Sequence, residues 1–93
     1  RKPILIGELE VLVKKFPAQK KSIIIFGENN INESKARIYN LSAKKNLQEA
    51  ALNLFKFLRQ CDEDESEIIL CGLLPEYGLG RAINDRLRRA SAK

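Results

Sequence analysis

The feature that most constrains this chain is the alternation of short β-branched runs with longer amphipathic segments. Residues 22–26 are apolar on both faces after the opening serine, a pattern typical of a central strand covered by helices on each side. Between such runs, apolar residues recur at spacings of three and four, which places them on one face of a helix. The chain is therefore expected to fold as a layered α/β domain.

Seven elements are expected, in the order β-α-β-β-α-β-α. The strands are predicted at 3–6, 22–26, 36–41 and 67–71, and the helices at 9–16, 46–60 and 79–90. This order gives about four strands and three helices in a small Rossmann-like domain with a mostly parallel sheet, in which the helical crossovers are right-handed.

The third strand differs from the others because polar and apolar residues are mixed along 36–41. Such a strand is expected at an edge of the sheet or half exposed. The linker before it has about eight residues, which is too short for a helical crossover. The second and third strands are therefore expected to be either antiparallel or not adjacent.

Two of the predicted helices carry long apolar stripes. Asn46 with Glu49 three positions later is a capping-box pattern, which predicts the start of a helix that should bury the largest apolar area of the domain. A solvated acidic turn, Asp62–Glu65, should end that helix. Its stripe comprises Leu47, Ala50, Ala51, Leu54, Leu58 and Cys61, widened by Phe55 and Phe57. The buried face of the last helix should comprise Leu79, Ala82, Ile83, Leu87 and Ala90.

The composition excludes most hydrolase chemistry. The chain has 93 residues, enough for one core, and it has no histidine, which removes the default general base near neutral pH. Cys61 and Cys71 match no metal or redox spacing, so two reduced, partly buried thiols are expected. We therefore predict no catalytic residue and no metal site.

The sequence also bears on location and completeness. No apolar run approaches the roughly 18 to 20 residues that span a bilayer, and the start of the chain lacks a secretory signal pattern. A soluble cytoplasmic protein with no membrane partner is expected. Because the sequence contains no methionine, residues 1–93 are expected to be a single domain excised from a longer protein.

The candidate binding residues are Gly78, Gly80 and Arg81. Two glycines that open a helix can present backbone N–H groups to a phosphate, and an arginine adds positive charge. The third glycine of a dinucleotide-binding motif would fall at position 83, which is isoleucine. The alternative interpretation is that both glycines relieve backbone crowding where a loop becomes a helix.

Four further small residues follow predicted strands: Gly7, Gly27, Ser42 and Gly72. Open α/β sheets bind ligands at the carboxyl ends of their strands, so this placement permits a pocket. Turns that end strands in any α/β domain have the same composition, so the pattern is also explained without a ligand.

The charge is uneven along the chain. The net charge is +5, yet residues 61–77 hold six of the twelve acidic residues and no basic one. A basic domain can attract nucleic acid, but no basic motif interleaved with aromatic residues is present. The last helix carries Arg81, Asp85 and Arg89 at spacings of four, which is either incidental surface or a docking face for an acidic partner.

Three segments together resemble a known family. They are 36–42, 46–59 and 78–90, the last reading from Gly78-Leu79-Gly80-Arg81 to Ala90. With them the chain resembles, over nearly its whole length, the C-terminal domain of two-domain threonylcarbamoyl-AMP synthases. The opening 2–7 resembles the segment in which the interdomain linker of that family runs into the first strand.

The resemblance implies a parent enzyme of the nucleotidyltransferase type, in which a YrdC-like domain makes threonylcarbamoyl-AMP from threonine, bicarbonate and ATP for tRNA modification. ATP and a divalent cation would bind in that catalytic domain, and no cofactor is expected in this chain. The chain would be a non-catalytic accessory domain that packs against the catalytic domain and positions the linker over its substrates. No catalytic residue of the family maps onto this sequence, and only Arg1 and Lys2 could belong to the linker.

Two departures from the family pattern are the acidic run Asp62–Glu65 and Cys71. They leave undecided which surface of the domain would contact a partner. Two other functions therefore stay possible from the sequence: a regulatory module that binds a nucleotide or another effector, and a module that docks weakly on tRNA or on other tRNA-modification proteins.

Overall fold

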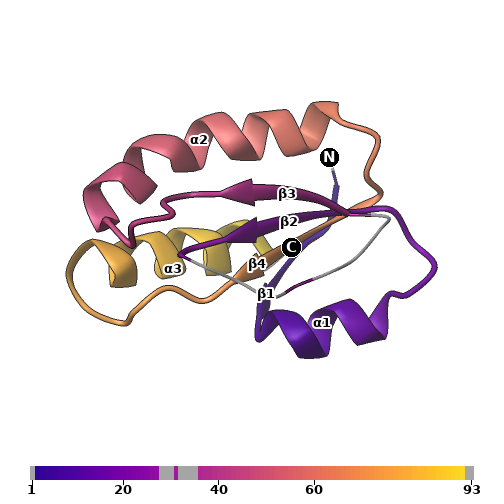
Figure 1. Cartoon of the computed structure of the whole chain (residues 1–93), viewed down its shortest axis with the longest axis horizontal. Coiled ribbons are helices and arrows are strands. Elements are labelled where there is room, and N and C mark those ends of the chain that lie inside the picture. Colours follow the sequence, from indigo (N-terminus) through magenta and orange to yellow (C-terminus); the bar gives the residue numbers. More distant parts are fainter. Residues whose placement is uncertain (1, 28–30, 32–35, 92–93) are drawn as a thin grey trace.

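Across the described residues, 2–27, 31 and 36–91, the computed structural model places four strands and three helices in the expected order. Figure 1 shows their arrangement. The strands are β1 (Ile4–Gly7), β2 (Lys21–Ile25), β3 (Ala36–Asn40) and β4 (Ile68–Gly72), and the helices are α1 (Leu9–Lys15), α2 (Leu47–Glu63) and α3 (Gly78–Ser91).

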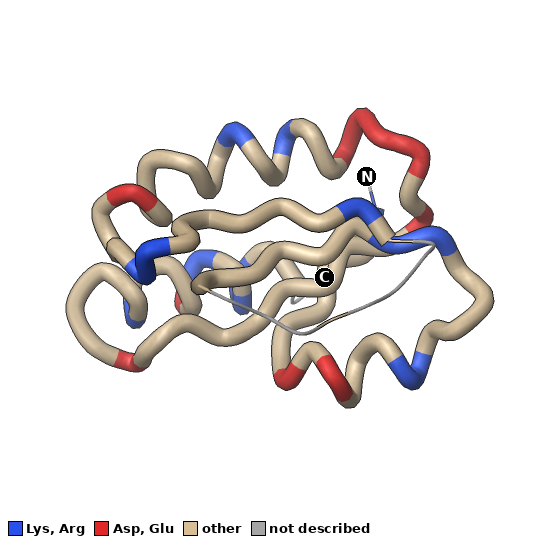
Figure 2. The backbone as a smooth tube through the Cα atoms, viewed as in Figure 1, with Lys and Arg blue, Asp and Glu red and all other residues tan. Residues whose placement is uncertain are grey.

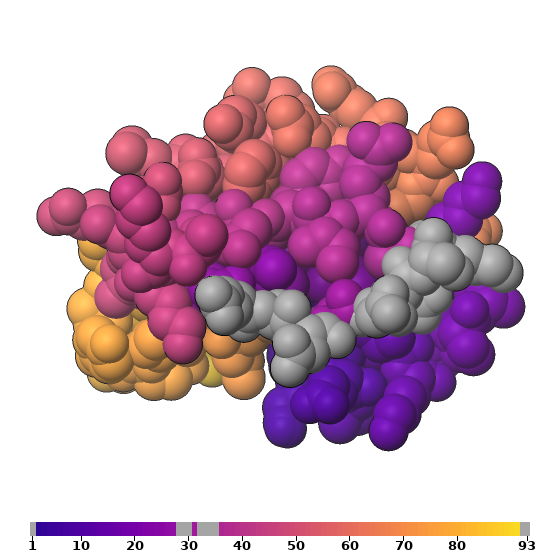
Figure 3. Space-filling view, viewed as in Figure 1, coloured from indigo at the N-terminus to yellow at the C-terminus, as the bar shows by residue number. Residues whose placement is uncertain are grey.

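The four strands form one sheet in the order β1-β4-β2-β3, and every neighbouring pair is parallel. Strands β4 and β2 lie in the centre, and all residues of β2 and the first four of β4 are buried. Strand β3 lies at an edge and is partly exposed, as its mixed composition predicts. In Figure 3 its magenta atoms reach the surface between α2 and the α1 side of the domain.

The expectation for β2 and β3 is wrong. They are adjacent and parallel, with Lys21 opposite Ala36. The connection between them spans 26–35, and about ten extended residues reach roughly 33 Å, about twice the rise of a five-residue strand. A helix is therefore unnecessary for the return. Ile31 packs with the α1-side core. Residues 28–30, which follow Gly27 at the predicted end of the second strand, and residues 32–35 lie outside the described residues.

Helices cover both faces of the sheet (Figure 1). Helices α2 and α3 pack on one face around Ile24, Leu54 and Leu87, and α1 packs on the other around Ile23 and Leu70. The connection through α1 runs from β1 to β2, and the one through α2 runs back from β3 to β4. Because they run in opposite directions on opposite faces, the two crossovers have the same hand.

Helix α2 begins as predicted, because the Oδ1 atom of Asn46 accepts a hydrogen bond of 2.9 Å from the Glu49 N–H. The Glu49 carboxylate accepts from Ser42 Oγ at 2.5 Å, and Ser42 Oγ in turn accepts from the Asn46 N–H. The predicted stripe is correct at Ala50, Leu54 and Cys61, which are buried. It is wrong at Phe55, which is 51% exposed.

Helix α3 is rotated relative to the predicted face. Leu79 and Ala82 are exposed, whereas Asn84 is fully buried beside Ile83 and Leu87. The Asn84 side chain accepts from the Leu74 N–H at 2.9 Å and donates to the Leu74 carbonyl at 2.8 Å. An asparagine that satisfies two backbone groups of a buried loop turns this side of the helix toward the sheet.

Candidate functional site

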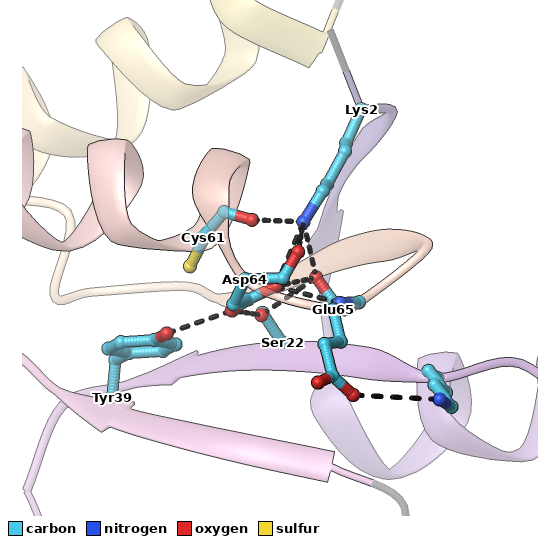
Figure 4. Close-up of polar contacts among 8 residues, drawn as sticks. Lys2, Ser22, Tyr39, Cys61, Asp64 and Glu65 are labelled. Carbon is cyan, nitrogen blue, oxygen red and sulfur yellow. Dashed lines mark hydrogen bonds and ion pairs between the residues drawn. The ribbon is translucent and has the colours of Figure 1, made fainter.

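A partly buried polar cluster lies near the start of the sheet, between α2 and the strands (Figure 4). We call it the Asp64 cluster. Lys2 lies just before β1, Ser22 is in β2, Tyr39 is in β3, and Asp64 and Ser66 follow the end of α2. It therefore joins four separate parts of the chain.

The chain turns at Asp64 because its own side chain stabilises the turn. The Asp64 N–H donates to the Gln60 carbonyl at 2.9 Å, which closes the last turn of α2. The Asp64 Oδ1 atom then accepts from the Ser66 N–H at 2.8 Å, as is typical of an Asx turn. This turn directs the chain into β4.

The Asp64 carboxylate is almost fully buried, with 6% of its side chain exposed. Its Oδ1 atom accepts from Lys2 Nζ at 2.9 Å, and its Oδ2 atom accepts from the hydroxyls of Tyr39, at 2.8 Å, and Ser22. Burial by itself would raise the pKa of Asp64, but the bonds from Ser22, Ser66 and Lys2 outweigh it and hold that pKa well below its usual range. The carboxylate therefore stays ionised at neutral pH.

The predicted solvated acidic turn is therefore wrong at Asp64. It is right for its neighbour Glu65, whose side chain is 85% exposed. Asp62 and Glu63 are exposed residues of the last turn of α2. Composition cannot indicate which acid of the run is buried, because all four residues are acidic.

Lys2 extends the cluster to the backbone of α2. Its Nζ atom donates to the carbonyl of Cys61, and it lies 2.8 Å from the Asp64 carbonyl and 3.1 Å from Ser66 Oγ. A cation beside the last carbonyls of a helix is favourable because these groups carry partial negative charge. Residue 2 is thus fixed to the end of a helix some 60 positions away in the sequence.

Tyr39 and the two thiols are poor proton carriers near neutral pH. Burial, followed by the hydrogen bond to Asp64, raises the pKa of Tyr39 to about 12. Burial also raises the pKa of the Cys61 and Cys71 thiols to about 12, and both cysteines are free and buried, as predicted. A general acid or base works best with a pKa near the working pH. The cluster is suited to holding a segment in place.

The sequence candidates Gly78, Gly80 and Arg81 lie at the start of α3, away from the Asp64 cluster. Gly78 has φ +52° with open space around it, so glycine is favoured there by the backbone conformation and not by lack of room. A Cβ atom at Gly80 would lie 2.1 Å from the Pro75 carbonyl oxygen, so only glycine leaves room for this close backbone contact. These contacts explain both glycines without a ligand, and the anion site there stays a prediction.

The residues expected at the carboxyl ends of the strands do meet at one edge, because all four strands are parallel. A shallow hollow of about 260 Å³ there is lined by Gly7, Glu8, Leu9, Glu10, Gly72 and Leu73. The Lys45 side chain covers Gly27, whose φ is +85°. A wider, open hollow of about 850 Å³ lies beside the Asp64 cluster, with both basic and acidic residues in its lining.

Two signals in the sequence could have indicated the Asp64 cluster. Ser22 is the one polar residue of the predicted strand 22–26, and Asp64 with Ser66 has the spacing of an Asx turn. Lys2 has no local signal, because its contacts join distant parts of the chain.

Within residues 2–27, 31 and 36–91, no group of three or more acidic or cysteine side chains is arranged to hold a metal ion. None of the helices in the same part of the chain combines the length and the apolar composition needed to cross a membrane.

The fold and the cluster define a small, wholly parallel α/β domain whose first residues are tied to its own second helix. The family described as the C-terminal domain of threonylcarbamoyl-AMP synthase matches residues 4–92, and the chain belongs to this family. The family suggested by the sequence segments is thereby confirmed.

Individual relatives agree with this assignment. A threonylcarbamoyl-AMP synthase from Pyrococcus abyssi is 33% identical over 84 residues, which cover 90% of this chain and 24% of the relative. The crystal structure of P. abyssi Sua5 complexed with L-threonine is 28% identical with a TM-score of 0.77, covering 98% of this chain and 28% of that one. A P. abyssi Sua5 variant with two alanine substitutions is 30% identical with a TM-score of 0.73, covering 97% and 29%. The chain spans about a quarter of the length of these relatives.

Proposed function

We propose that this chain is a non-catalytic accessory domain of a threonylcarbamoyl-AMP synthase, and that it holds the end of the interdomain linker through Lys2. The synthase would make threonylcarbamoyl-AMP from threonine, bicarbonate and ATP for tRNA modification. Its catalytic domain, outside this sequence, would bind ATP and a divalent cation.

The observation that carries this proposal is the way Lys2 is held. Its ammonium group lies among four oxygen atoms from the end of α2 and the following turn, and 17% of its side chain is exposed. A linker fixed at its last residue has fewer conformations, which raises the effective concentration of its other end near a site it must cover. The Asp64 cluster would therefore act as the anchor of the linker.

The electrostatics support a role without catalysis. The pKa of Tyr39 and of both thiols is raised to about 12, and that of Asp64 is lowered, so these groups keep one protonation state near neutral pH. The chain incubated alone with threonine, bicarbonate and ATP should give no threonylcarbamoyl-AMP or pyrophosphate above the blank. Formation of either product would contradict this part of the proposal.

The anchor is tested in the full-length synthase with Lys2→Ala, Asp64→Asn and the double variant. Each single variant should lower threonylcarbamoyl-AMP formation by about tenfold, the effect of roughly 1.4 kcal/mol. The double variant should be no worse than the singles, because both remove the same contact. The segment before Lys2 should also become more sensitive to proteolysis.

Asp62→Asn is the matched control, because Asp62 is an exposed acid two positions away. It should leave activity and proteolysis unchanged. Full activity of both single variants, in domains that remain folded by thermal denaturation, would show that the Lys2 contact does not matter to the enzyme. Stabilisation of the chain by ATP or AMP, or selective tRNA binding at physiological salt, would favour the regulatory or the tRNA-docking function instead.

A further inference from the structure

An exposed apolar surface crosses from α2 to α3. Leu52 is 81% exposed, and Phe55, one turn later, is 51% exposed. The Arg86 guanidinium of α3 lies over the Phe55 ring, 4.2 Å from its centroid. Leu79 precedes Arg86 by seven residues, lies on the same side of α3, and is 42% exposed. We call Leu52, Phe55, Leu79 and Arg86 the α2–α3 surface.

The chemistry of this surface is that of a protein interface. A single exposed leucine is common on a folded protein, but here two large apolar side chains lie within one helical turn. Phenylalanine and arginine are enriched in interfaces, and an arginine stacked on a ring still presents N–H donors at the edge of the contact. The surface therefore combines an apolar centre with a cationic donor.

The charges around the surface indicate the kind of partner. Lys56 and Arg59 of α2 and Arg89 of α3 are exposed, and Figure 2 shows blue positions along both helices. A second copy of this chain would bring these cations against one another, which disfavours a symmetric dimer. A partner that offers an apolar hollow with carboxylates at its rim would complement the surface.

The position of the anchored segment indicates where that partner is attached. Lys2 is bonded to the end of α2, and Figure 1 shows the N-terminal end of the chain beside it. Polypeptide that precedes Lys2 would thus leave the domain on the side that α2 and α3 cover. The chain corresponds to 24% of its P. abyssi relative, so in such a synthase most of the polypeptide lies elsewhere.

From these observations we propose that the α2–α3 surface is the face on which the larger part of the same synthase docks. The proposal rests on the proposed function, because it requires this domain to belong to a larger synthase. The docked part has an apolar hollow that receives Leu52 and Phe55, and carboxylates that pair with Arg86 and its basic neighbours.

Cysteine labelling of the full-length synthase tests this proposal. Leu52→Cys is compared with Val11→Cys on α1, which is 51% exposed on the opposite face of the sheet. A maleimide reagent labels each protein, and the modified peptide is quantified by mass spectrometry. Exposure within this domain alone predicts faster labelling at position 52. Docking reverses this order, because an interface closed nine-tenths of the time lowers the labelling rate at position 52 about tenfold from its undocked value, which brings it below the rate at position 11.

A second variant separates docking from other causes of slow labelling. Adding Arg86→Glu to Leu52→Cys should restore fast labelling, because the reversed charge opposes the carboxylates of the partner. Equal or faster labelling at position 52 in an active synthase overturns the docking face and leaves the proposed function intact. Protection that disappears on dilution, together with dissociation of a dimer, overturns it in favour of a second copy. A full-length protein without threonylcarbamoyl-AMP formation would instead refute the proposed function.

Discussion

Near the start of the sheet the Asp64 carboxylate holds Lys2, Ser22 and Tyr39 together, whereas at the opposite end of the domain two glycines shape the start of α3. The first region depends on charge and hydrogen bonds between distant segments. The second, at the start of α3, depends on the close approach of Gly80 to the Pro75 carbonyl. The two ends should therefore respond to different perturbations, the first to loss of charge or low pH and the second to added volume.

The largest effect is expected from Asp64→Ala, which removes the acceptor shared by Lys2, Ser22 and Tyr39. Loss of one partner of a buried pair leaves the other charge uncompensated, so the free energy of unfolding should fall by about 4 kcal/mol. Asp62→Ala, at an exposed position, should change it by less than about 0.5 kcal/mol. Denaturant unfolding of both variants measures the difference, and similar midpoints would mean that Asp64 is not buried.

At the opposite edge, Gly80→Ala should lower the free energy of unfolding by about 3 kcal/mol, because the new methyl group meets the Pro75 carbonyl oxygen and backbone must move. Gly78→Ala has open space around it and only the left-handed backbone to oppose it, so it should cost about 1 kcal/mol. The order of the two melting temperatures is the measurement. If Gly78→Ala were the more damaging variant, the contact between Gly80 and Pro75 would be incorrect.

Acid should weaken the contribution of Asp64 to stability. The folded pKa of Asp64 lies below its unfolded value of about 4, so its contribution to stability is complete above pH 4 and is lost as the pH falls toward the folded pKa. Below pH 4 the unfolding free energy should therefore fall more steeply for the parent than for Asp64→Asn, by up to about 1.4 kcal/mol per pH unit. Gly80→Ala keeps the carboxylate and should retain the parental slope. Parallel curves for the parent and Asp64→Asn would contradict the pKa shift.

The smallest effect is expected from Arg81→Ala, whose side chain is exposed. Its free energy of unfolding should stay within about 0.5 kcal/mol of the parent, and ATP, AMP and pyrophosphate should raise the melting temperature of neither. A nucleotide-dependent rise in the parent that disappears in Arg81→Ala would make the start of α3 an anion site. The Asp64 cluster would then be an anchor and the start of α3 a ligand site.

Most of the fold could be predicted from the sequence, but little of the candidate site. The capping pattern at Asn46 and the β-branched run of β2 are local signals, and the structure has a helix beginning after Asn46 and a strand at that run. The glycines at 78 and 80 are also local signals, and they marked the start of α3 correctly. The Asp64 cluster joins four separate parts of the chain, so no window of the sequence contains it.

The sequence by itself determined the order of the elements and the family, because spacing, caps and turn residues act within a few positions. Tertiary structure decided the direction of β3, the buried face of α3 and the burial of Asp64. Each of these depends on a partner distant in the chain or on the reach of a connection. The Asn84 side chain turns α3 because it pairs with the Leu74 backbone, and Asp64 tolerates burial because Lys2 compensates its charge and Ser22 donates a hydrogen bond to it.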